Sequence, residues 1–173
     1  DPSEYETCLV IPIKGKPLKF GKCSQLEFSA DSIFSNKSIN KFFVATDSEY
    51  TADLAKELGF SIVQLRDSSL SLPATAIEDV QSWHLNKLEE LLDYHPDVIV
   101  HAEVTFPYRP LKLLDRLIDY FAFTGADTVL PAKVEYTWAW KNHEGDNFVR
   151  LDEGDVPRRY KKSLLLGSHG LGC

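Results

Sequence analysis

Short apolar runs alternate with longer stretches of helical spacing along most of the chain. The runs predict buried strands over residues 8–13, 42–46, 61–65, 97–102 and 127–134. Apolar positions at helical spacing predict helices over residues 24–34, 49–58, 74–94 and 111–124. Because strands that alternate with helices pair in parallel between helix layers, the pattern predicts an α/β three-layer sandwich with a mostly parallel sheet.

The rhythm changes in the last third of the chain. Residues 136–141 and 147–151 are short β-prone runs on either side of the polar turn 143–146, which predicts a late antiparallel hairpin. Trp138 and Trp140 share one face of the first run, because side chains alternate along a strand. We expect these rings either in the core or in a dimer interface, where large aromatic side chains are common.

The strand at 42–46 runs straight into a helix and gives a place to look for a site. Asp47 or Ser48 can cap that helix by accepting a hydrogen bond from a free N–H group of its first turn. Gly59 ends the helix, since glycine adopts the left-handed conformation at no steric cost. The resulting strand–helix–strand unit places Thr46 and Asp47 at the carboxyl end of a parallel strand, where open α/β sheets bind ligands.

Composition excludes several classes of protein. The 173 residues carry a net charge of −7, which argues against a nucleic-acid partner. No apolar run has the length of a membrane span, and no signal peptide is recognised. The three cysteines lack C-x-x-C spacing, so we expect reduced thiols in a cytoplasmic protein without a membrane partner. No G-x-G-x-x-G follows the first strand, which disfavours a dinucleotide-dependent dehydrogenase.

Three loops that follow predicted strands carry reactive side chains. They hold, in chain order, Lys14 and Lys16 around Gly15, then Asp47, and then Glu103, Thr105, Tyr108 and Arg109. Loops at the carboxyl ends of parallel strands meet at one edge of the sheet, so we expect a shared site there. Plainer roles compete with this interpretation: a solvated lysine-rich turn, a helix N-cap at Asp47 and a salt bridge at Arg109.

Six short segments resemble, in the same order, motifs of the cytidylyltransferases that activate acidic sugars, the CMP-sialic acid and CMP-Kdo synthetases. The segments are Val10–Lys14, Lys14–Leu18, Val44–Glu49, Thr105–Arg109, Gly125–Val129 and Gly154–Tyr160. The resemblance implies one nucleotidyltransferase domain over residues 1–173, with a Rossmann-like sheet of the nucleotide-diphospho-sugar transferase type. It also implies a homodimer to which the late hairpin contributes.

The resemblance further implies that CTP and a 3-deoxy sugar acid, such as sialic acid, react to give a CMP-sugar and pyrophosphate with Mg²⁺ as cofactor. The implied nucleotide-binding residues are Lys14, Lys16, Arg66 and Thr75. The implied sugar-binding residues are Glu103, Thr105, Tyr108 and Arg109. Catalytic roles fall to Lys16 and Asp47, and Asp47 and Glu103 are the candidate metal ligands.

The chain also departs from the family pattern. The family's phosphate-binding loop between Ile13 and Lys14 is missing, the C-terminal metal-binding acids have no counterpart, and Glu103 stands where the family has Gln. The chain contains no methionine, which agrees with a sequence from which pieces are absent; true loss of the loop is the alternative. The other functions to consider are therefore a CMP-Kdo synthetase, transfer of a nucleotide to a sugar or polyol phosphate, and a catalytically degenerate nucleotide-binding or assembly subunit.

Overall fold

A computed structural model describes residues 1–145, 147–152, 154–167 and 171–173 of the chain. The chain divides into two compact units. The first, which we call the sheet unit, comprises Asp1–Val129 and Gly170–Cys173, and the second, the hairpin unit, comprises Leu130–His169. Whether the whole chain acts as the single nucleotidyltransferase domain expected from the sequence stays a prediction.

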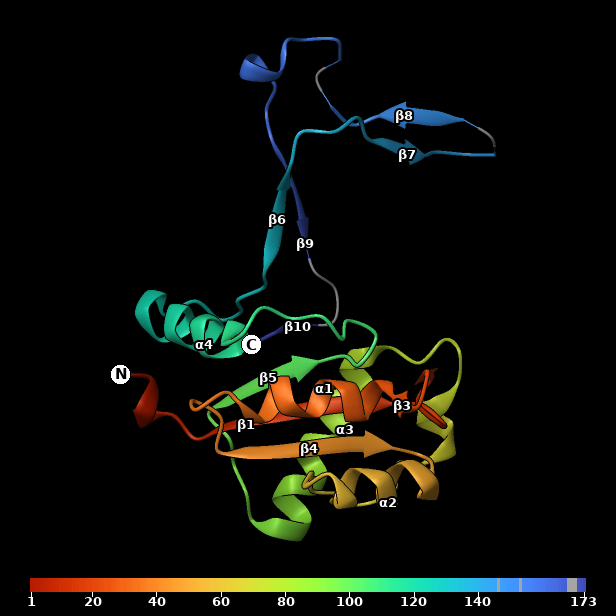
Figure 1. Cartoon of the computed structure of the whole chain (residues 1–173), viewed down its shortest axis with the longest axis vertical. Coiled ribbons are helices and arrows are strands. Elements are labelled where there is room, and N and C mark those ends of the chain that lie inside the picture. The colour runs from red at the N-terminus through yellow and green to blue at the C-terminus, as the bar shows by residue number, and fades with distance from the viewer. Residues whose placement is uncertain (146, 153, 168–170) are drawn as a thin grey trace. The chain divides into compact units, whose positions relative to one another are not determined.

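The sheet unit is built on three parallel strands. β1 (Thr7–Ile13) lies between β4 (Lys41–Thr46) and β5 (Val98–Ala102). The short β10 (Leu171–Gly172) pairs antiparallel with the outer side of β5. In this register Ile13 lies opposite Thr46, so β1 and β4 end at the same edge of the sheet (Figure 1).

Helices cover both faces of this sheet. Leu9, Ile11 and Ile13 of β1 pack with α1 (Gln25–Phe34) and α4 (Leu113–Thr124). Cys8 and Val10, which alternate with them, pack with α3 (Ile77–Leu92) on the opposite face, and α2 (Glu49–Glu57) lies against β4 (Figure 1). The predicted α/β three-layer sandwich with a mostly parallel sheet is confirmed.

Capping residues explain where several helices begin and end. Ser24 and Glu27 form a reciprocal capping box at the start of α1. Ser48, not Asp47, caps α2, because the Ser48 Oγ accepts a hydrogen bond from the Thr51 N–H at 3.4 Å. Gly125 ends α4 with a φ of +63°, a left-handed conformation that favours glycine. The remaining short elements of the sheet unit are η1 (Pro2–Glu4), β2 (Lys19–Phe20), β3 (Cys23–Ser24) and η2 (Ser68–Ser71).

The prediction of a regular strand over residues 61–65 is wrong. Ser61 forms an isolated parallel bridge with Phe43. The next bond to β4 runs from the Arg66 N–H to the Thr46 carbonyl, whereas a regular ladder that steps by two residues from Ser61 would use residue 65. One extra residue is therefore accommodated at this edge of the sheet, as in a β-bulge, and it places Arg66 beside the end of β4.

The prediction of a buried strand over residues 127–134 is also wrong. Val129 is buried, and its backbone exchanges two hydrogen bonds with Cys173. Pro131 follows, and a proline has no N–H group to continue a ladder. The strand that forms, β6 (Ala132–Glu135), belongs to the hairpin unit, where it pairs antiparallel with β9 (Leu164–Gly167).

The hairpin unit contains a second antiparallel pair, β7 (Trp140–Asn142) and β8 (Phe148–Arg150), and the turn η3 (Arg158–Tyr160). This pair confirms the predicted late hairpin, although its strands are shorter than the predicted runs. Among the described residues of the chain, no helix combines the length and the apolar character needed to cross a membrane.

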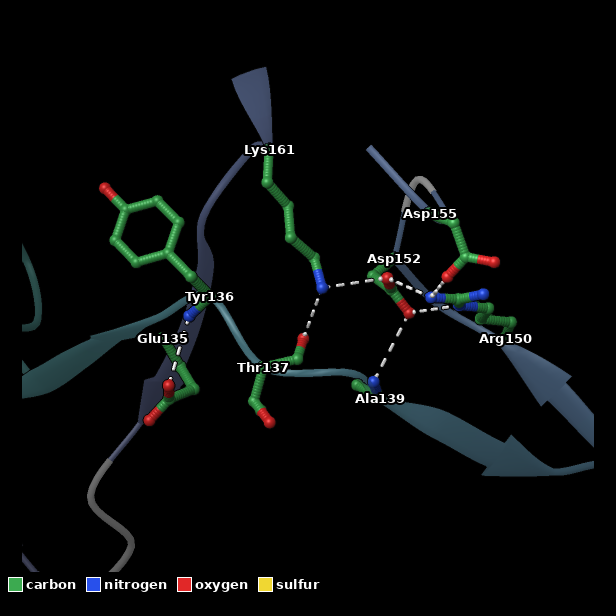
Figure 2. A network of polar contacts seen from close by, with 8 residues as sticks. All are labelled: Glu135, Tyr136, Thr137, Ala139, Arg150, Asp152, Asp155 and Lys161. Atoms are coloured by element: carbon green, nitrogen blue, oxygen red, sulfur yellow. Dashed lines mark hydrogen bonds and ion pairs between the residues drawn. The ribbon is translucent and has the colours of Figure 1, made fainter. Parts of the chain in front are cut away.

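A charged network fixes the base of this hairpin (Figure 2). The Asp152 side chain is 1% exposed and accepts from Arg150 Nε at 2.8 Å and from Lys161 Nζ at 3.0 Å. The Ala139 N–H also points to Asp152, at 3.4 Å. Hydrogen bonds from Arg150, and then from Lys161, hold the pKa of Asp152 well below its usual range although desolvation opposes them. Asp152 therefore joins the end of β8 to the segments around Ala139 and Lys161.

Candidate functional site

An open pocket lies at the carboxyl edge of the sheet, and it gathers five of the residues singled out in the sequence. They are Lys14, Arg66, Thr75, Glu103 and Thr105. Lys14 directly follows β1, and Glu103 directly follows β5. The lining also has an apolar part, which includes Leu72, Ile77 and Val80. Charged groups beside an apolar wall are typical of a small-molecule site, and the location agrees with the rule for open α/β sheets.

The turn after β1 is fixed by the end of β4. The Gly15 N–H donates to Asp47 Oδ1 at 2.7 Å, and the Thr51 hydroxyl donates to the Gly15 carbonyl at 2.6 Å. Gly15 has a φ of +61°, where a side chain would strain the backbone. Both polar groups around Gly15 are thus held by the β4–α2 connection, and this fixes the course of the chain next to Lys14.

Lys16, on the other side of Gly15, is not among the residues that line the pocket. Its Nζ lies 4.9 Å from the centre of the Tyr50 ring, on α2. This is a cation–π contact, which is weak at an exposed position. The catalytic and nucleotide-binding roles implied for Lys16 stay predictions, and the geometry favours Lys14 for contact with a ligand.

Asp47 is ionised and serves the turn, not the pocket wall. Partial burial acts to raise its pKa, but the Gly15 N–H, the Ser71 side chain and the Arg66 charge together lower it below the usual value. The sequence left the N-cap of α2 open between Asp47 and Ser48. Because Ser48 takes that role, the Asp47 carboxylate is left for Gly15.

Arg66 brings a buried positive charge to the pocket. Its side chain is 6% exposed, and its Nε donates to Ser71 Oγ at 3.2 Å. Burial lowers the pKa of Arg66, and the Asp47 charge opposes the change. An arginine starts from so high a pKa that it stays charged. A charge held in a low-dielectric wall acts more strongly on an anionic ligand than a solvated one.

Glu103 and Thr105 also line the pocket and contact each other. The Thr105 hydroxyl donates to Glu103 Oε2 at 2.8 Å, and Glu103 Oε1 lies 3.5 Å from His101 Nε2. His101 in turn contacts Gln81, on α3, with 2.9 Å between Gln81 Nε2 and His101 Nδ1. Burial lowers the pKa of His101, although Glu103 and Glu78 raise it.

Sequence reasoning missed His101 and Gln81. The signal was available for His101, a polar residue inside a buried strand two positions before Glu103. For Gln81 there was no such signal, since its role depends on how α3 packs on the sheet.

Tyr108 and Arg109 are outside the residues that line the pocket. Tyr108 is 85% exposed, and its ring lies edge-on against Phe28 with 5.2 Å between centroids. Arg109 Nη2 donates to the Glu103 carbonyl, while Nε and Nη1 are buried and have no hydrogen-bond partner among the described residues. Burial lowers the pKa of Arg109, and the Glu103 charge opposes it. Arg109 therefore pairs with the backbone of the site, and the salt bridge considered from the sequence is not formed with any acid that the structure describes.

Asp47 and Glu103 are the two candidate metal ligands, and their donor atoms and positions decide whether they fit Mg²⁺. Asp47 and Glu103 offer carboxylate oxygens, the donor type that Mg²⁺ prefers. Within the described part of the chain, no group of three or more His, Cys, Asp and Glu side chains is placed to hold a metal ion. Only Glu103 of the two lines the pocket, whereas the Asp47 carboxylate is held by the Gly15 N–H outside that lining, so the pair does not form one Mg²⁺ site.

The sequence matches no protein-family model and no curated protein. Its structure resembles that of a 4-diphosphocytidyl-2C-methyl-D-erythritol synthase, with a TM-score of 0.69 and 13% identity, covering 97% of this chain and 74% of that chain. A CMP:2-keto-3-deoxy-manno-octonic acid synthetase solved with CTP gives a TM-score of 0.69 at 10% identity, over 96% and 73%. A 4-diphosphocytidyl-2C-methyl-D-erythritol synthase from Anaerococcus prevotii DSM 20548 gives 0.66 at 13%, over 99% and 71%.

These three neighbours are cytidylyltransferases, and thus nucleotidyltransferase enzymes. At identities this low the likeness shows the fold alone. The chain therefore has the Rossmann-like α/β fold of nucleotidyltransferases.

Proposed function

We propose that this chain transfers a cytidylyl group from CTP to a hydroxyl group of an acceptor and releases pyrophosphate. The pocket carries the proposal. It places Lys14, Arg66 and Thr75 together with Glu103 and Thr105 at the carboxyl edge of a sheet whose fold is that of the cytidylyltransferases above. These are the residue types that the reaction needs: cations for a triphosphate, and hydrogen-bonding groups for an acceptor.

The chemistry follows from the charges in the pocket. The acceptor oxygen attacks the α-phosphorus, the bond from that phosphorus to the bridging oxygen of pyrophosphate breaks, and the hydroxyl proton leaves to a base or to water. Lys14 and the buried Arg66 stabilise the negative charge of the phosphates. We propose Mg²⁺ as the cofactor; it would neutralise further phosphate charge, with most of its ligands supplied by the phosphates and by water.

We further propose a 3-deoxy sugar acid such as sialic acid as the acceptor. The six segments that resemble motifs of the cytidylyltransferases of acidic sugars support it. The solved neighbours suggest alternative acceptors. One of them makes a CMP-linked keto-deoxy-octonic acid, and the other two make a diphosphocytidyl-linked erythritol derivative.

Nucleotide binding tests the proposal at its first step. Isothermal titration with CTP, UTP, GTP and ATP in the presence of Mg²⁺ should show binding of CTP at least about tenfold tighter than of the other three. Equal affinity for all four, or no binding of CTP, would contradict the proposal. Binding of CTP without turnover on any acceptor would instead favour the catalytically degenerate subunit.

We also propose that the hairpin unit pairs with a second copy of the chain. Several of its largest apolar side chains are at least half exposed: Trp138, Trp140, Phe148, Tyr160 and Leu165. Surfaces of this kind mark interaction sites. Sedimentation should show a dimer that the double substitution W140D/F148D converts to monomer, whereas F123D, at an 87% exposed position of the sheet unit, leaves it intact. A wild-type monomer at working concentration would contradict this proposal.

A further inference from the structure

A chain of polar contacts runs from α3 across β5 to the pocket. Gln81 Nε2 lies 2.9 Å from His101 Nδ1, and His101 Nε2 lies 3.5 Å from Glu103 Oε1. Glu103 Oε2 accepts from the Thr105 hydroxyl at 2.8 Å. Each carboxylate oxygen of Glu103 thus has one protein group beside it.

These contacts select one tautomer of His101. An ionised carboxylate only accepts hydrogen bonds, so the His101 nitrogen that faces Glu103 must carry the proton. In the neutral ring the other nitrogen, Nδ1, is then an acceptor, and the Gln81 amide N–H donates to it. The contacts with Glu103 and with Gln81 therefore both require the Nε2–H tautomer of His101.

The chain of contacts is anchored on rigid elements. His101 lies inside β5, opposite Val10 of β1, and its side chain is 15% exposed. Gln81 is on α3, which packs on the same face of the sheet as Val10. Glu103, by contrast, is the first residue after β5 and its side chain is 33% exposed, so its direction depends on the groups that hold it.

We propose that His101, with its tautomer fixed by Gln81, is a positioning residue that aims the Glu103 carboxylate into the pocket. There the carboxylate selects ligand groups that donate hydrogen bonds, as the hydroxyl groups of a sugar acceptor do. A carboxylate has about four lone-pair sites, and the two protein contacts leave room for such a group. The part played in catalysis rests on the proposed function, whereas the tautomer does not.

The kinetic test compares substitutions along the chain of contacts, using CTP and N-acetylneuraminic acid as probes. H101L should raise the KM for the sugar acid about fivefold to tenfold, because a charged group loses one contact that holds it, and change the KM for CTP little. E103Q should do the same, and the double variant should be no worse than either single one, because the two residues act as one unit. H101Q, which keeps an N–H donor, should recover part of the loss.

The matched control is H84L, which removes the other buried histidine. His84 is on α3 like Gln81, but in the described part of the chain neither of its ring nitrogens has a hydrogen-bond partner. H84L should leave both KM values unchanged. Equal effects of H84L and H101L, or full additivity of H101L and E103Q, would overturn the positioning role.

Long-range ¹H–¹⁵N correlation spectra of the histidine rings keep the proposal testable without turnover. The wild-type spectrum should show His101 as the Nε2–H tautomer, and Q81L should produce a mixture of tautomers. A His101 ring in the Nδ1–H form, or one that Q81L does not affect, would overturn the proposal even if the enzyme is active. If the protein transfers no nucleotide but His101 is the Nε2–H tautomer, the proposed function is contradicted and the inference about the His101 tautomer still holds.

Discussion

Asp47 and Gly15 are joined by a 2.7 Å hydrogen bond between a carboxylate and a backbone N–H group. The two residues are 32 positions apart, and they meet because β1 and β4 end in register at Ile13 and Thr46. This bond ties the turn that carries Lys14 to the end of a neighbouring strand. The position of Lys14 in the pocket thus depends on the sheet and not on the turn alone.

D47A should therefore loosen the turn after β1. Removing a charge-assisted hydrogen bond at a partly buried site should lower the free energy of unfolding by about 1–2 kcal/mol and weaken CTP binding, because Lys14 loses its fixed position. Urea denaturation and calorimetric titration measure the two effects. D53A, which removes an exposed carboxylate of the neighbouring helix α2, is the control and should change neither quantity. A D47A protein with wild-type CTP affinity would contradict the account of the turn.

The two lysines beside Gly15 should contribute unequally. Lys14 lines the pocket, whereas Lys16 lies over the Tyr50 ring. K14A should weaken CTP binding about tenfold or more, the cost of one charge-assisted contact to phosphate, and K16A much less. The motifs of the sequence imply instead that Lys16 is a catalytic group and matters more than Lys14. Loss of most transfer in K16A with little change in K14A would show that the bound state differs from the geometry described here.

Stability should depend on pH through His84. Burial lowers the pKa of His84 from 6.5 to about 4. The unfolded chain binds this proton near pH 6.5 and the folded protein only near pH 4. Stability is therefore full above about pH 6.5 and falls as the pH drops toward 4, by about 3 kcal/mol at most. The comparison is between urea denaturation at pH 7.5 and at pH 4.5.

H84L should show a flatter dependence over the same interval, since it has no ring to protonate. Identical slopes for wild type and H84L would mean that His84 does not titrate as its burial requires.

The Asp152 network should hold the base of the hairpin unit. D152N removes the charge that Arg150 and Lys161 share, so amide exchange should accelerate around Ala139, whose N–H points to this carboxylate. Exchange in β1 of the sheet unit should not change. D155N is the control, because Asp155 is 83% exposed and contacts Arg150 alone among the described ion pairs. Equal protection in D152N and wild type would show that the network does not stabilise the hairpin.

Local signals made much of the fold predictable. Capping residues such as Ser24, Ser48 and Gly125 mark helix ends through contacts within one turn, which a sequence displays directly. The misses depend on distant partners. The extra residue before Arg66 can be recognised only from its register with β4. The end of the predicted strand at Val129 depends on pairing with Cys173, which is far along the chain.

The site divides in the same way. Lys14 and Glu103 were predictable because each directly follows a parallel strand, and such ends converge at one edge. The direction of Lys16 was not, because the left-handed conformation of Gly15 turns the chain before it. Gln81 could not be found either, since it reaches His101 only through the packing of α3 on the sheet.

Pyrophosphate release tests the central claim most directly. The protein is incubated with CTP, Mg²⁺ and, one at a time, N-acetylneuraminic acid, Kdo, other 3-deoxy sugar acids and polyol phosphates, and released pyrophosphate is measured. Release with a sugar acid, none with CTP alone, and loss of the signal in K14A are the predicted results. Release with a polyol phosphate alone would keep cytidylyl transfer and change the acceptor. Silence with every acceptor, from protein that binds no CTP, would contradict the account.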